Sequence, residues 1–379
     1  MKVAILKETF PGEKRVAMVP KHVEKLVGLG ATVKVEKGLG ETINHKDAEY
    51  TDIGAEIVED RQKLLAEADL VLRLRKPSIE EVSWQKEGSI SISYLDPFNE
   101  DALVEAMRVS KVSAFSMEMI PRSTIAQKMD ALSSQASLAG YVATLLAAEN
   151  LDGIFPMMMT PAGTLSPARV FIIGAGVAGL QAIATAKRLG ARVEAFDTRA
   201  VVETEVKSLG GKFIKIDLGE TGQTKDGYAK ALTNEQLDLQ RQGLAKVCAR
   251  SDVVITTAQL FGRPAPRILT KEMVAMMKPG SVIVDMAVES GGNVDGSELD
   301  KIVEVDGVKI IGYGNLPGRV PLHASQMYSS NLYSLIEELW SKDEKSIILD
   351  QTNEITSSAL VTYKGEMVNE TIKNIKSKS

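Results

Sequence analysis

Three glycines spaced as G-x-G-x-x-G lie between an apolar run and a helical stretch, and this feature constrains the fold most. The motif reads Gly174-Ala175-Gly176-Val177-Ala178-Gly179. Residues 170–173 before it are apolar, residues 178–189 after it have a helical pattern, and a second apolar run follows at 193–196. In such a unit the first glycine permits a tight turn, the second lets the backbone approach a pyrophosphate, and the third allows helix and strand to pack closely. The motif predicts a dinucleotide-binding βαβ unit; the alternative is a glycine turn without a ligand.

An acidic residue follows at the position that contacts the adenosine ribose in this kind of unit. Asp197 stands 18 residues after Gly179, at the end of the second apolar run. A carboxylate there accepts hydrogen bonds from both ribose hydroxyls and repels a 2′-phosphate. The sequence therefore predicts NAD(H) rather than NADP(H), although Arg199 lies two residues further on.

Strand and helix signals alternate over most of the 379 residues, about twice the length of a typical domain of roughly 150 residues. In the first third, strands are expected at 3–6, 32–36, 70–74, 89–94 and 114–117, and helices at 20–29, 61–68 and 100–109. Near-continuous apolar runs at 253–257, 282–286 and 308–312 are typical of parallel strands covered on both faces. The expected class is α/β, with two Rossmann-like domains of doubly wound parallel sheets, joined by long helices with a cleft between them.

The last part of the chain is expected to return to the first domain. Its helix at 331–340 and apolar stretch at 359–363 do not resemble a further strand–helix unit. The first domain is therefore expected to comprise residues 1–130 plus 325–379, and the NAD(H)-binding domain residues 131–324. The passage between 153 and 167 is rich in proline and glycine and is expected to be a loop.

Composition excludes several classes of partner. The net charge is −5 without a basic stripe, so nucleic acid is not expected. A single cysteine, Cys248, suits a reducing compartment such as the cytoplasm, and a buried structural thiol is expected. The apolar stretch at 138–148 is about half of the ~20 residues that span a membrane, so no direct membrane insertion is expected. The three histidines have no ligand spacing, and no metal site is predicted.

Polar residues on a second segment are candidates for the reacting end of the site. Residues 126–149 have a helical pattern, and Gln127, Asp130 and Ser133 recur on it at i, i+3 and i+6. With Arg122 just before the helix, this stripe could bind a carboxamide such as that of nicotinamide; a solvated helix face is the alternative. Gly227 and Tyr228 lie in a polar stretch that is either a mobile flap or a plain surface loop.

Nearly the whole chain resembles the soluble NAD(H)-binding component (domain I, alpha-1 subunit) of proton-translocating nicotinamide nucleotide transhydrogenases and, more distantly, alanine dehydrogenases. The likeness lies in the glycine motif and in several further short motifs: Lys7-Glu8, Pro11-Gly12-Glu13, Arg15-Val16-Ala17, Pro121-Arg122, Ala126-Gln127, Met129-Asp130, Leu132-Ser133-Ser134-Gln135, Phe155-Pro156-Met157-Met158-Met159-Thr160 and Met277-Lys278-Pro279-Gly280-Ser281.

The resemblance implies a role for each candidate residue. It implies that Arg122, Asp130 and Ser133 fix the nicotinamide carboxamide, and that Gln127 faces the NADP(H) of a partner domain. The remaining nucleotide contacts that it implies are the glycine motif with Val177 and Ala178, the ribose segment Asp197, Thr198 and Arg199, the mobile-loop residues Gly227 and Tyr228, and Gln240 and Gln259.

The resemblance also implies the reaction and its partners. NADH would pass hydride directly to NADP+ on a partner subunit, in an AB-stereospecific reaction that membrane-spanning subunits couple to proton translocation. A homodimer, peripheral on the inner face of the cell membrane through its partners, is expected. Alanine dehydrogenases bind and protonate their keto acid with a lysine and a histidine, and these positions hold Arg75 and Asp96 here. An alanine dehydrogenase-like oxidoreductase and a non-catalytic NAD(H)-sensing module are the alternatives.

Overall fold

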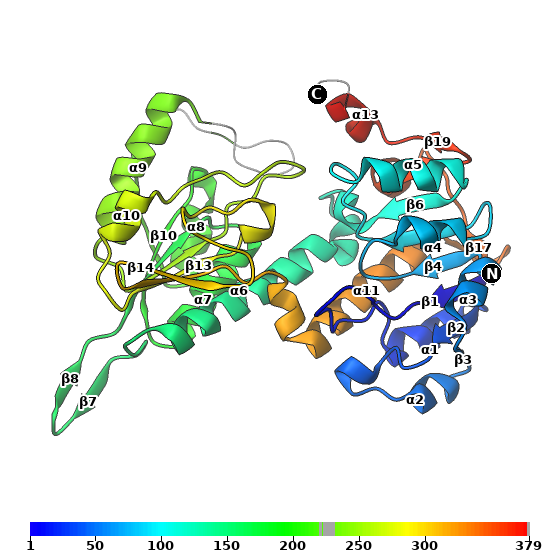
Figure 1. The fold of residues 1–379 in the computed structure, drawn as a ribbon, viewed down its shortest axis with the longest axis horizontal. Helices are drawn as coiled ribbons and strands as arrows, with labels where there is room; N and C mark the ends of the chain where they lie inside the picture. Colours follow the sequence, from blue (N-terminus) through cyan, green and yellow to red (C-terminus); the bar gives the residue numbers. More distant parts are fainter. Residues whose placement is uncertain (220–221, 223–231, 377–379) are drawn as a thin grey trace. The chain divides into compact units, whose positions relative to one another are not determined.

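The computed structural model describes residues 1–219, 222 and 232–376 and divides the chain into two compact units (Figure 1). Unit 1 comprises Met1–Gln135 and Gly318–Ser379, and unit 2 comprises Ala136–Pro317. The sequence placed these boundaries after residues 130 and 324. The second boundary moves because a long helix begins at Pro321 and packs entirely within unit 1.

Unit 1 is built on an eight-stranded sheet in the order β19-β18-β6-β5-β4-β1-β2-β3. Strands β1 to β6 are parallel, and β18 and β19 add an antiparallel edge. Their bounds are β1 Lys2–Ile5, β2 Thr32–Glu36, β3 Glu56–Val58, β4 Leu70–Leu72, β5 Ile90–Ser93, β6 Ser113–Ser116, β18 Leu360–Tyr363 and β19 Glu366–Met367. The chain thus returns to the first unit, and β1 to β6 have the doubly wound order 3-2-1-4-5-6.

Helices cover this sheet and supply much of its buried apolar surface. They are α1 Pro20–Gly28, α2 Asp47–Thr51, α3 Arg61–Glu67, α4 Ile79–Ser83, α5 Asp101–Val109, α11 Pro321–Leu339, α12 Glu354–Ala359 and α13 Glu370–Lys376. Leu64 and Leu65 of α3 pack on Ala4 and Val71 of the sheet. The sequence placed the helix that is now α11 at 331–340; Pro321, which suits the first turn of a helix, starts it ten residues earlier.

Unit 2 contains a seven-stranded sheet in the order β11-β10-β9-β12-β13-β15-β14. All its strands are parallel except β14, which pairs antiparallel with β15. The bounds are β9 Arg169–Ile173, β10 Arg192–Phe196, β11 Lys212–Phe213, β12 Val253–Thr256, β13 Val282–Asp285, β14 Ile302–Val305 and β15 Val308–Ile311. From β11 to β15 this is the doubly wound order again, so the strand order reverses between β9 and β12.

The helices of unit 2 are α7 Val177–Arg188, α8 Glu203–Ser208, α9 Asn234–Cys248 and α10 Lys271–Ala275. Apolar side chains from α9 and α10, such as Leu244 and Met273, pack with Phe171 and Ile283 of the sheet into one core. Cys248 belongs to this core, and burial raises the pKa of its thiol to about 12, which confirms the expected structural thiol.

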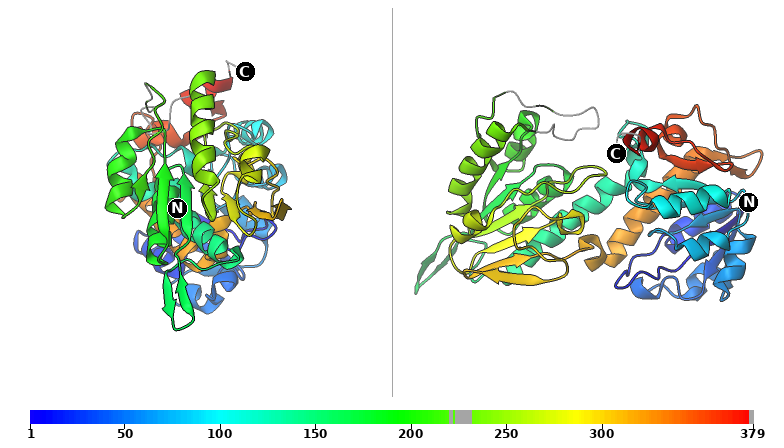
Figure 2. Two further views of the ribbon diagram at one scale, coloured as in Figure 1. Left: turned by 90° about the vertical axis from the view of Figure 1, so that its left-hand side faces the viewer. Right: turned by 45° about the horizontal axis from the view of Figure 1, so that its top comes forward.

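The passage expected as a loop contains a β-hairpin instead. Strands β7 (Met158–Thr160) and β8 (Gly163–Leu165) pair antiparallel and project from the rest of unit 2 (Figures 1 and 2). All six strand residues are exposed. The hairpin was missed because the sequence Met-Met-Thr-Pro-Ala-Gly-Thr-Leu lacks the alternation of apolar and polar residues that marks a half-buried strand.

The long helix also differs from its prediction. Helix α6 spans Ala131–Asn150, whereas residues Ala126–Met129 form a separate 3₁₀ helix, η3. By length and composition α6 is apolar enough to cross a membrane, contrary to the expectation from residues 138–148, but half of it is buried within the fold. Gly140 of α6 lies against α7 so closely that a Cβ there would be 2.1 Å from the carbonyl oxygen of Ala178. A core helix of this kind meets the same length and composition criteria.

Candidate functional site

The glycine turn has the geometry that the motif requires. Gly174 has φ +98°, a left-handed conformation that favours glycine, as it leaves β9. Gly176 is the N-cap of α7, so the free N–H groups of the first turn of α7 follow it directly. Gly179 faces back toward the strand, and a Cβ there would lie 1.8 Å from the carbonyl oxygen of Gly174. The turn therefore presents the amino end of a helix without side chains in front of it, which is how a pyrophosphate is bound.

Asp197 lies beside this turn, at the carboxyl end of β10. Its Oδ2 accepts a hydrogen bond of 2.8 Å from the backbone N–H of Ala175, which joins the ends of β9 and β10. Arg199 donates to the same carboxylate from its backbone N–H (2.9 Å), Nε (2.9 Å) and Nη2 (2.8 Å). The structure thus brings the glycine turn together with Asp197, Thr198 and Arg199 at the edge where α/β sheets bind ligands.

A third loop, after β12, completes this edge and was largely missed by sequence reasoning. Thr257 donates a hydrogen bond of 3.0 Å from Oγ1 to the carbonyl oxygen of Gly174. Gln259, predicted as a nucleotide contact, is exposed on this loop and donates from Nε2 to the Met286 carbonyl oxygen at 3.2 Å. The only sequence signal for Thr257 was its position at the end of an apolar run.

The loop after β12 is held in place from behind by a buried amide. Asn293 is fully buried; its Oδ1 accepts from the backbone N–H of Ala258 at 3.1 Å, and its Nδ2 donates to the Ala258 carbonyl oxygen at 2.9 Å. The backbone N–H of Asn293 donates in turn to the buried carboxylate of Asp285, with distances of 3.0 and 3.1 Å. This chain of contacts ties the loop to the end of β13. Nothing in local sequence pattern distinguishes Asn293 from an ordinary loop residue.

Two further predicted contacts lie away from the glycine turn or outside the described residues. Gln240 is buried on α9, a helix of unit 2 that begins at Asn234. Gly227 and Tyr228, the proposed flap residues, lie outside the described part of the chain.

The predicted polar stripe on the long helix is wrong as a helical face. Gln127 lies exposed on η3, and Asp130, with ψ 88°, separates η3 from α6. The Asp130 carboxylate instead caps α6: it accepts from the Ser133 backbone N–H at 2.8 Å and from Ser133 Oγ at 2.5 Å. Asp is a favoured N-cap residue because its side chain satisfies free N–H groups of the first turn. The structure thus joins Asp130 to Ser133, while Arg122 is exposed in the preceding segment.

The segment that carries these residues is anchored within unit 1. Asn331 of α11 donates from Nδ2 to the Lys128 carbonyl oxygen at 2.9 Å and accepts from Ser134 Oγ at 2.7 Å. Gln135, one turn along α6, is buried; it donates to the Ala324 carbonyl oxygen at 3.0 Å and accepts from Arg15 Nη1 at 2.9 Å. The start of α6 is therefore fixed on two sides by buried side chains.

Arg15 belongs to a buried ionic cluster at the carboxyl edge of the unit 1 sheet. Glu13, whose side chain is 0% exposed, accepts from Arg15 Nε and Nη2 at 2.8 and 2.7 Å, and from Arg75 Nε at 2.8 Å. Burial raises the pKa of Glu13, but the hydrogen bonds and charge of Arg15, with the charge of Arg75, outweigh it and lower the pKa to about 2. Glu13 is therefore ionised at neutral pH and neutralised internally.

This cluster bears on the alternative activity. Arg75, at the position of the alanine dehydrogenase lysine, is paired with Glu13, and Asp96, at the position of the histidine, lies 3.7 Å from Lys76 Nζ. Arg has a pKa above 12 and an ionised Asp does not protonate a keto acid at neutral pH, so neither residue replaces its counterpart.

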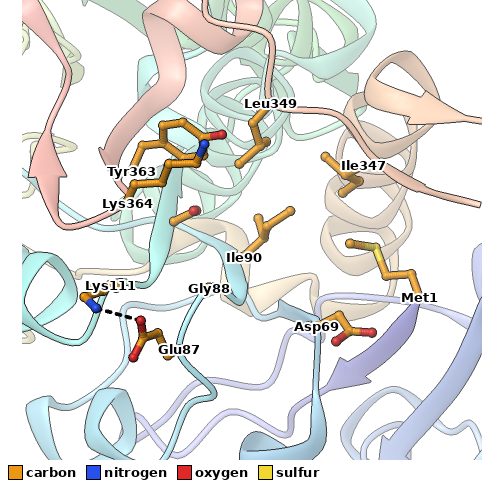
Figure 3. A pocket seen from close by; sticks show the side chains of 11 residues that line it. Met1, Asp69, Glu87, Gly88, Ile90, Lys111, Ile347, Leu349, Tyr363 and Lys364 are labelled. Carbon is orange, nitrogen blue, oxygen red and sulfur yellow. Dashed lines mark hydrogen bonds and ion pairs between the residues drawn. The ribbon is translucent and has the colours of Figure 1, made fainter. Parts of the chain in front are cut away.

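The pocket shown in Figure 3 lies at the other edge of the same sheet. It has a volume of about 500 Å³ and is lined by residues that begin β1, β4 and β5, including Met1, Asp69 and Ile90. Lys111 and Glu87 form an ion pair of 2.7 Å at its rim (Figure 3). Because α/β sheets bind cofactors at the carboxyl ends of their strands, this pocket is not the candidate cofactor site.

Comparison with known proteins places the chain in a family. Family models described as Alanine dehydrogenase/PNT, N-terminal domain and C-terminal domain match residues 4–139 and 143–370. The chain belongs to the alanine dehydrogenase/PNT family.

Within this family the similarity is greater to transhydrogenases. The chain is 46% identical over 375 residues to the first of the polypeptides that form NAD(P) transhydrogenase subunit alpha of Rhodospirillum rubrum, covering 97% of this chain and 98% of that protein. The crystal structure of transhydrogenase from Sinorhizobium meliloti matches with a TM-score of 0.87 and 42% identity, covering 97% of this chain and all of that one. The alanine dehydrogenase of Halomonas elongata is 29% identical, covering 92% of this chain and 90% of that protein. These comparisons favour the NAD(P) transhydrogenase alpha subunits over the alanine dehydrogenases.

Proposed function

We propose that this chain is the NAD(H)-binding subunit of a proton-translocating transhydrogenase, which passes hydride from NADH directly to NADP+ on a partner subunit. The observation that carries the proposal is the glycine turn of unit 2 with Asp197 beside it, at the point where the strand order reverses. Direct transfer between two nicotinamides requires alignment of the rings and no general acid. This agrees with Arg75 and Asp96 standing where alanine dehydrogenases have a lysine and a histidine.

The residues of unit 2 fit NAD(H). Among the described atoms, a Cβ on Gly176 would meet nothing nearer than Arg199 Nη2 at 4.0 Å, so the space in front of α7 is open to a pyrophosphate. Asp197 selects an adenosine ribose without a 2′-phosphate, because two negative groups would repel each other there. Gln240, Gln259, Gly227 and Tyr228 are proposed as further contacts from the family likeness. Bound NADH supplies the hydride.

Asp130 and Ser133 are proposed to hold the carboxamide of the nicotinamide, with Arg122, while Gln127 faces the partner's nucleotide. The pair is pre-organised, since the carboxylate already fixes both the backbone and the hydroxyl of Ser133. A carboxylate and a hydroxyl together can accept from and donate to a carboxamide, which has both an oxygen and an NH₂ group.

Asp130→Ala is expected to lower the rate of hydride transfer at subsaturating NADH by about 10- to 100-fold. A hydrogen bond to a charged group contributes about 1.5–3 kcal/mol, and each 1.4 kcal/mol is a factor of ten. Steady-state rates with an NADP(H)-binding partner measure the effect. Asp130→Asn is the control for α6, because Asn also caps helices. Rates for Asp130→Ala within twofold of the parent would contradict the assignment.

The experiment that tests the function compares two activities of the unmodified chain. Nicotinamide fluorescence during titration should show NADH binding and much weaker NADPH binding, and addition of an NADP(H)-binding partner should start hydride exchange. Alanine formation from pyruvate, ammonium and NADH, without exchange, would establish the dehydrogenase alternative. NADH binding with neither reaction would establish a sensing module.

The partners and location follow from the same proposal. The membrane-spanning and NADP(H)-binding subunits would lie on other polypeptides, and this chain would be cytoplasmic and peripheral on the inner face of the cell membrane. A homodimer is also proposed, supported by the hairpin β7–β8. Its segment exposes four large apolar side chains: Met157 (57%), Met158 (44%), Met159 (74%) and Leu165 (52%). Contiguous exposed apolar side chains of this kind mark interaction sites.

Replacing both Met158 and Met159 with aspartate is expected to convert the dimer to a monomer at micromolar concentration. Charges at the centre of an apolar interface are costly to bury, whereas the glycine turn is left intact. Light scattering after size exclusion gives the mass, and NADH titration checks the fold. Met276→Asp is the matched control, because Met276 is also half exposed (52%) but lies on another element. A variant that remains dimeric would show that the hairpin is not the interface.

A further inference from the structure

Arg199 and the adenosine ribose need the same carboxylate. A carboxylate has about four positions that accept hydrogen bonds. On Asp197, Arg199 contributes three donors and Ala175 the fourth, all at 2.8–2.9 Å. The two side chains are 7% and 16% exposed, respectively, so this ion pair is largely removed from water. Two ribose hydroxyls can donate to Asp197 only if the Arg199 side chain withdraws some of its bonds.

The guanidinium also lies where the nucleotide would be. Its Nη2 is the described atom nearest to a Cβ built on Gly176, the glycine that faces the pyrophosphate. A hydrogen bond from Asp197 is the main influence that raises the pKa of Arg199, followed by opposing burial and by the charges of Asp197 and Glu205. Asp197 is therefore the principal group that neutralises this cation.

We propose that Arg199 is a second determinant of nucleotide specificity: a cation able to bind a ribose 2′-phosphate, which Asp197 keeps engaged so that the site accepts only the unphosphorylated ribose. The proposal rests on the proposed NAD(H) function and adds to it. Asp197 alone would exclude NADP(H) by repulsion, whereas the pair does so by repulsion and by withholding the one guanidinium that would reward a phosphate. Arg is the side chain best suited to a phosphate, because its planar fork donates two parallel bonds.

This arrangement predicts opposite effects for the two members of the pair. Without the carboxylate, the guanidinium keeps its place beside the ribose but loses its main counter-charge, and a phosphate restores one. Without the guanidinium, the carboxylate is free to accept from the ribose hydroxyls and repels a 2′-phosphate more strongly. A residue that merely supported the loop would weaken both nucleotides alike.

The test measures dissociation constants for NADH and NADPH by calorimetry on the full chain. Asp197→Ser should bind NADPH at least tenfold more tightly than the parent, and Asp197→Ser with Arg199→Met should lose that gain. Arg199→Met alone should raise the ratio of the NADPH to the NADH constant at least tenfold. Arg192→Met, which removes an exposed arginine at the amino end of β10, should leave the ratio within twofold of the parent.

The possible failures are distinguishable. If Asp197→Ser gains nothing for NADPH, or keeps its gain when Arg199 is also replaced, the role of Arg199 is refuted while the NAD(H) function stands. If Asp197→Ser does not fold, the ratio for Arg199→Met decides alone, and an unchanged ratio refutes the proposal. If the parent chain binds no NADH, the proposed function itself fails.

Discussion

Gly179→Ala is expected to weaken NADH binding by at least about 100-fold. The added Cβ would lie 1.8 Å from the carbonyl oxygen and 2.9 Å from the carbonyl carbon of Gly174. Contacts this short cannot be relieved by a side-chain rotation, because both partners are backbone. Helix α7 must therefore move away from β9, and its N-terminal N–H groups move with it, away from the position of the pyrophosphate. Calorimetric titration with NADH measures the loss.

Gly153→Ala is the matched control for this prediction. It lies in the same unit, and the nearest atoms to its added Cβ belong to the Leu151 side chain at 3.8 Å, an ordinary contact distance. Its NADH affinity should equal that of the parent. If Gly179→Ala bound NADH within threefold of the parent and kept the same melting temperature, the glycine turn would not be the pyrophosphate site.

Glu13→Gln is expected to lower the free energy of unfolding of unit 1 by about 3–5 kcal/mol. The substitution removes the carboxylate between Arg15 and Arg75 and leaves two cations in a site where the Glu13 side chain is fully buried. Breaking a buried ion pair at one member typically costs this much, because the remaining charge is uncompensated. Urea unfolding followed by circular dichroism measures the change. Glu105→Gln is the control: Glu105 pairs with Arg108 on the surface, and its loss should cost less than about 1 kcal/mol.

Acid is expected to destabilise unit 1 through the same cluster and through Glu81. Burial raises the pKa of Glu81, but its hydrogen bonds and charge interaction with Arg73 outweigh burial and lower the pKa to about 2, as for Glu13. Since these folded-state values lie below the ordinary value of 4.5, the unfolded chain binds more protons. The stabilisation is complete above pH 4.5 and is lost as the pH falls from 4.5 to 2, by about 3 kcal/mol for each group.

Urea unfolding at pH 7, 4 and 3 tests this dependence. The parent should lose stability steeply over this range, and Glu13→Gln should lose less, because one of the two groups no longer titrates. Equal losses in the two proteins would show that Glu13 is not held ionised by its arginines.

Local sequence signals were sufficient for the part of the site that is local in the chain. The glycine turn is a motif of six residues between a strand and a helix, and each glycine is required by a contact with its immediate neighbours. The parallel strands were recognisable because both faces of each are buried, which gives short runs such as Val253–Thr256. Asp197 followed from the length of one strand–helix–strand unit.

The errors arose where one local signal competed with another. Residues 126–149 have a continuous helical pattern, yet Asp130 and Ser133 form an N-cap that starts the helix at Ala131. Asp competes with the helix by bonding nearby backbone N–H groups, so a periodic pattern does not exclude a cap within it. The same effect placed Gln127 on a separate 3₁₀ helix.

Contacts between distant residues left no signal in the sequence. Arg15 meets Gln135 across 120 positions, and Asn293 meets Ala258 across 35. Each partner is an unremarkable polar residue until the fold brings the two together in a buried place, where an unsatisfied polar group would be costly. Such positioning contacts emerge only from three-dimensional structure.

The central claim is direct hydride transfer from NADH on this chain to NADP+ on a partner. NADH deuterated at C4 on one face of the nicotinamide, incubated in ordinary water with this chain, an NADP(H)-binding partner and NADP+, tests it most directly. The account predicts that deuterium from one face of NADH appears at C4 of the NADPH formed, without dilution by solvent hydrogen. Loss of the deuterium to water, or its transfer to alanine when pyruvate and ammonium are present with none in NADPH, would contradict it.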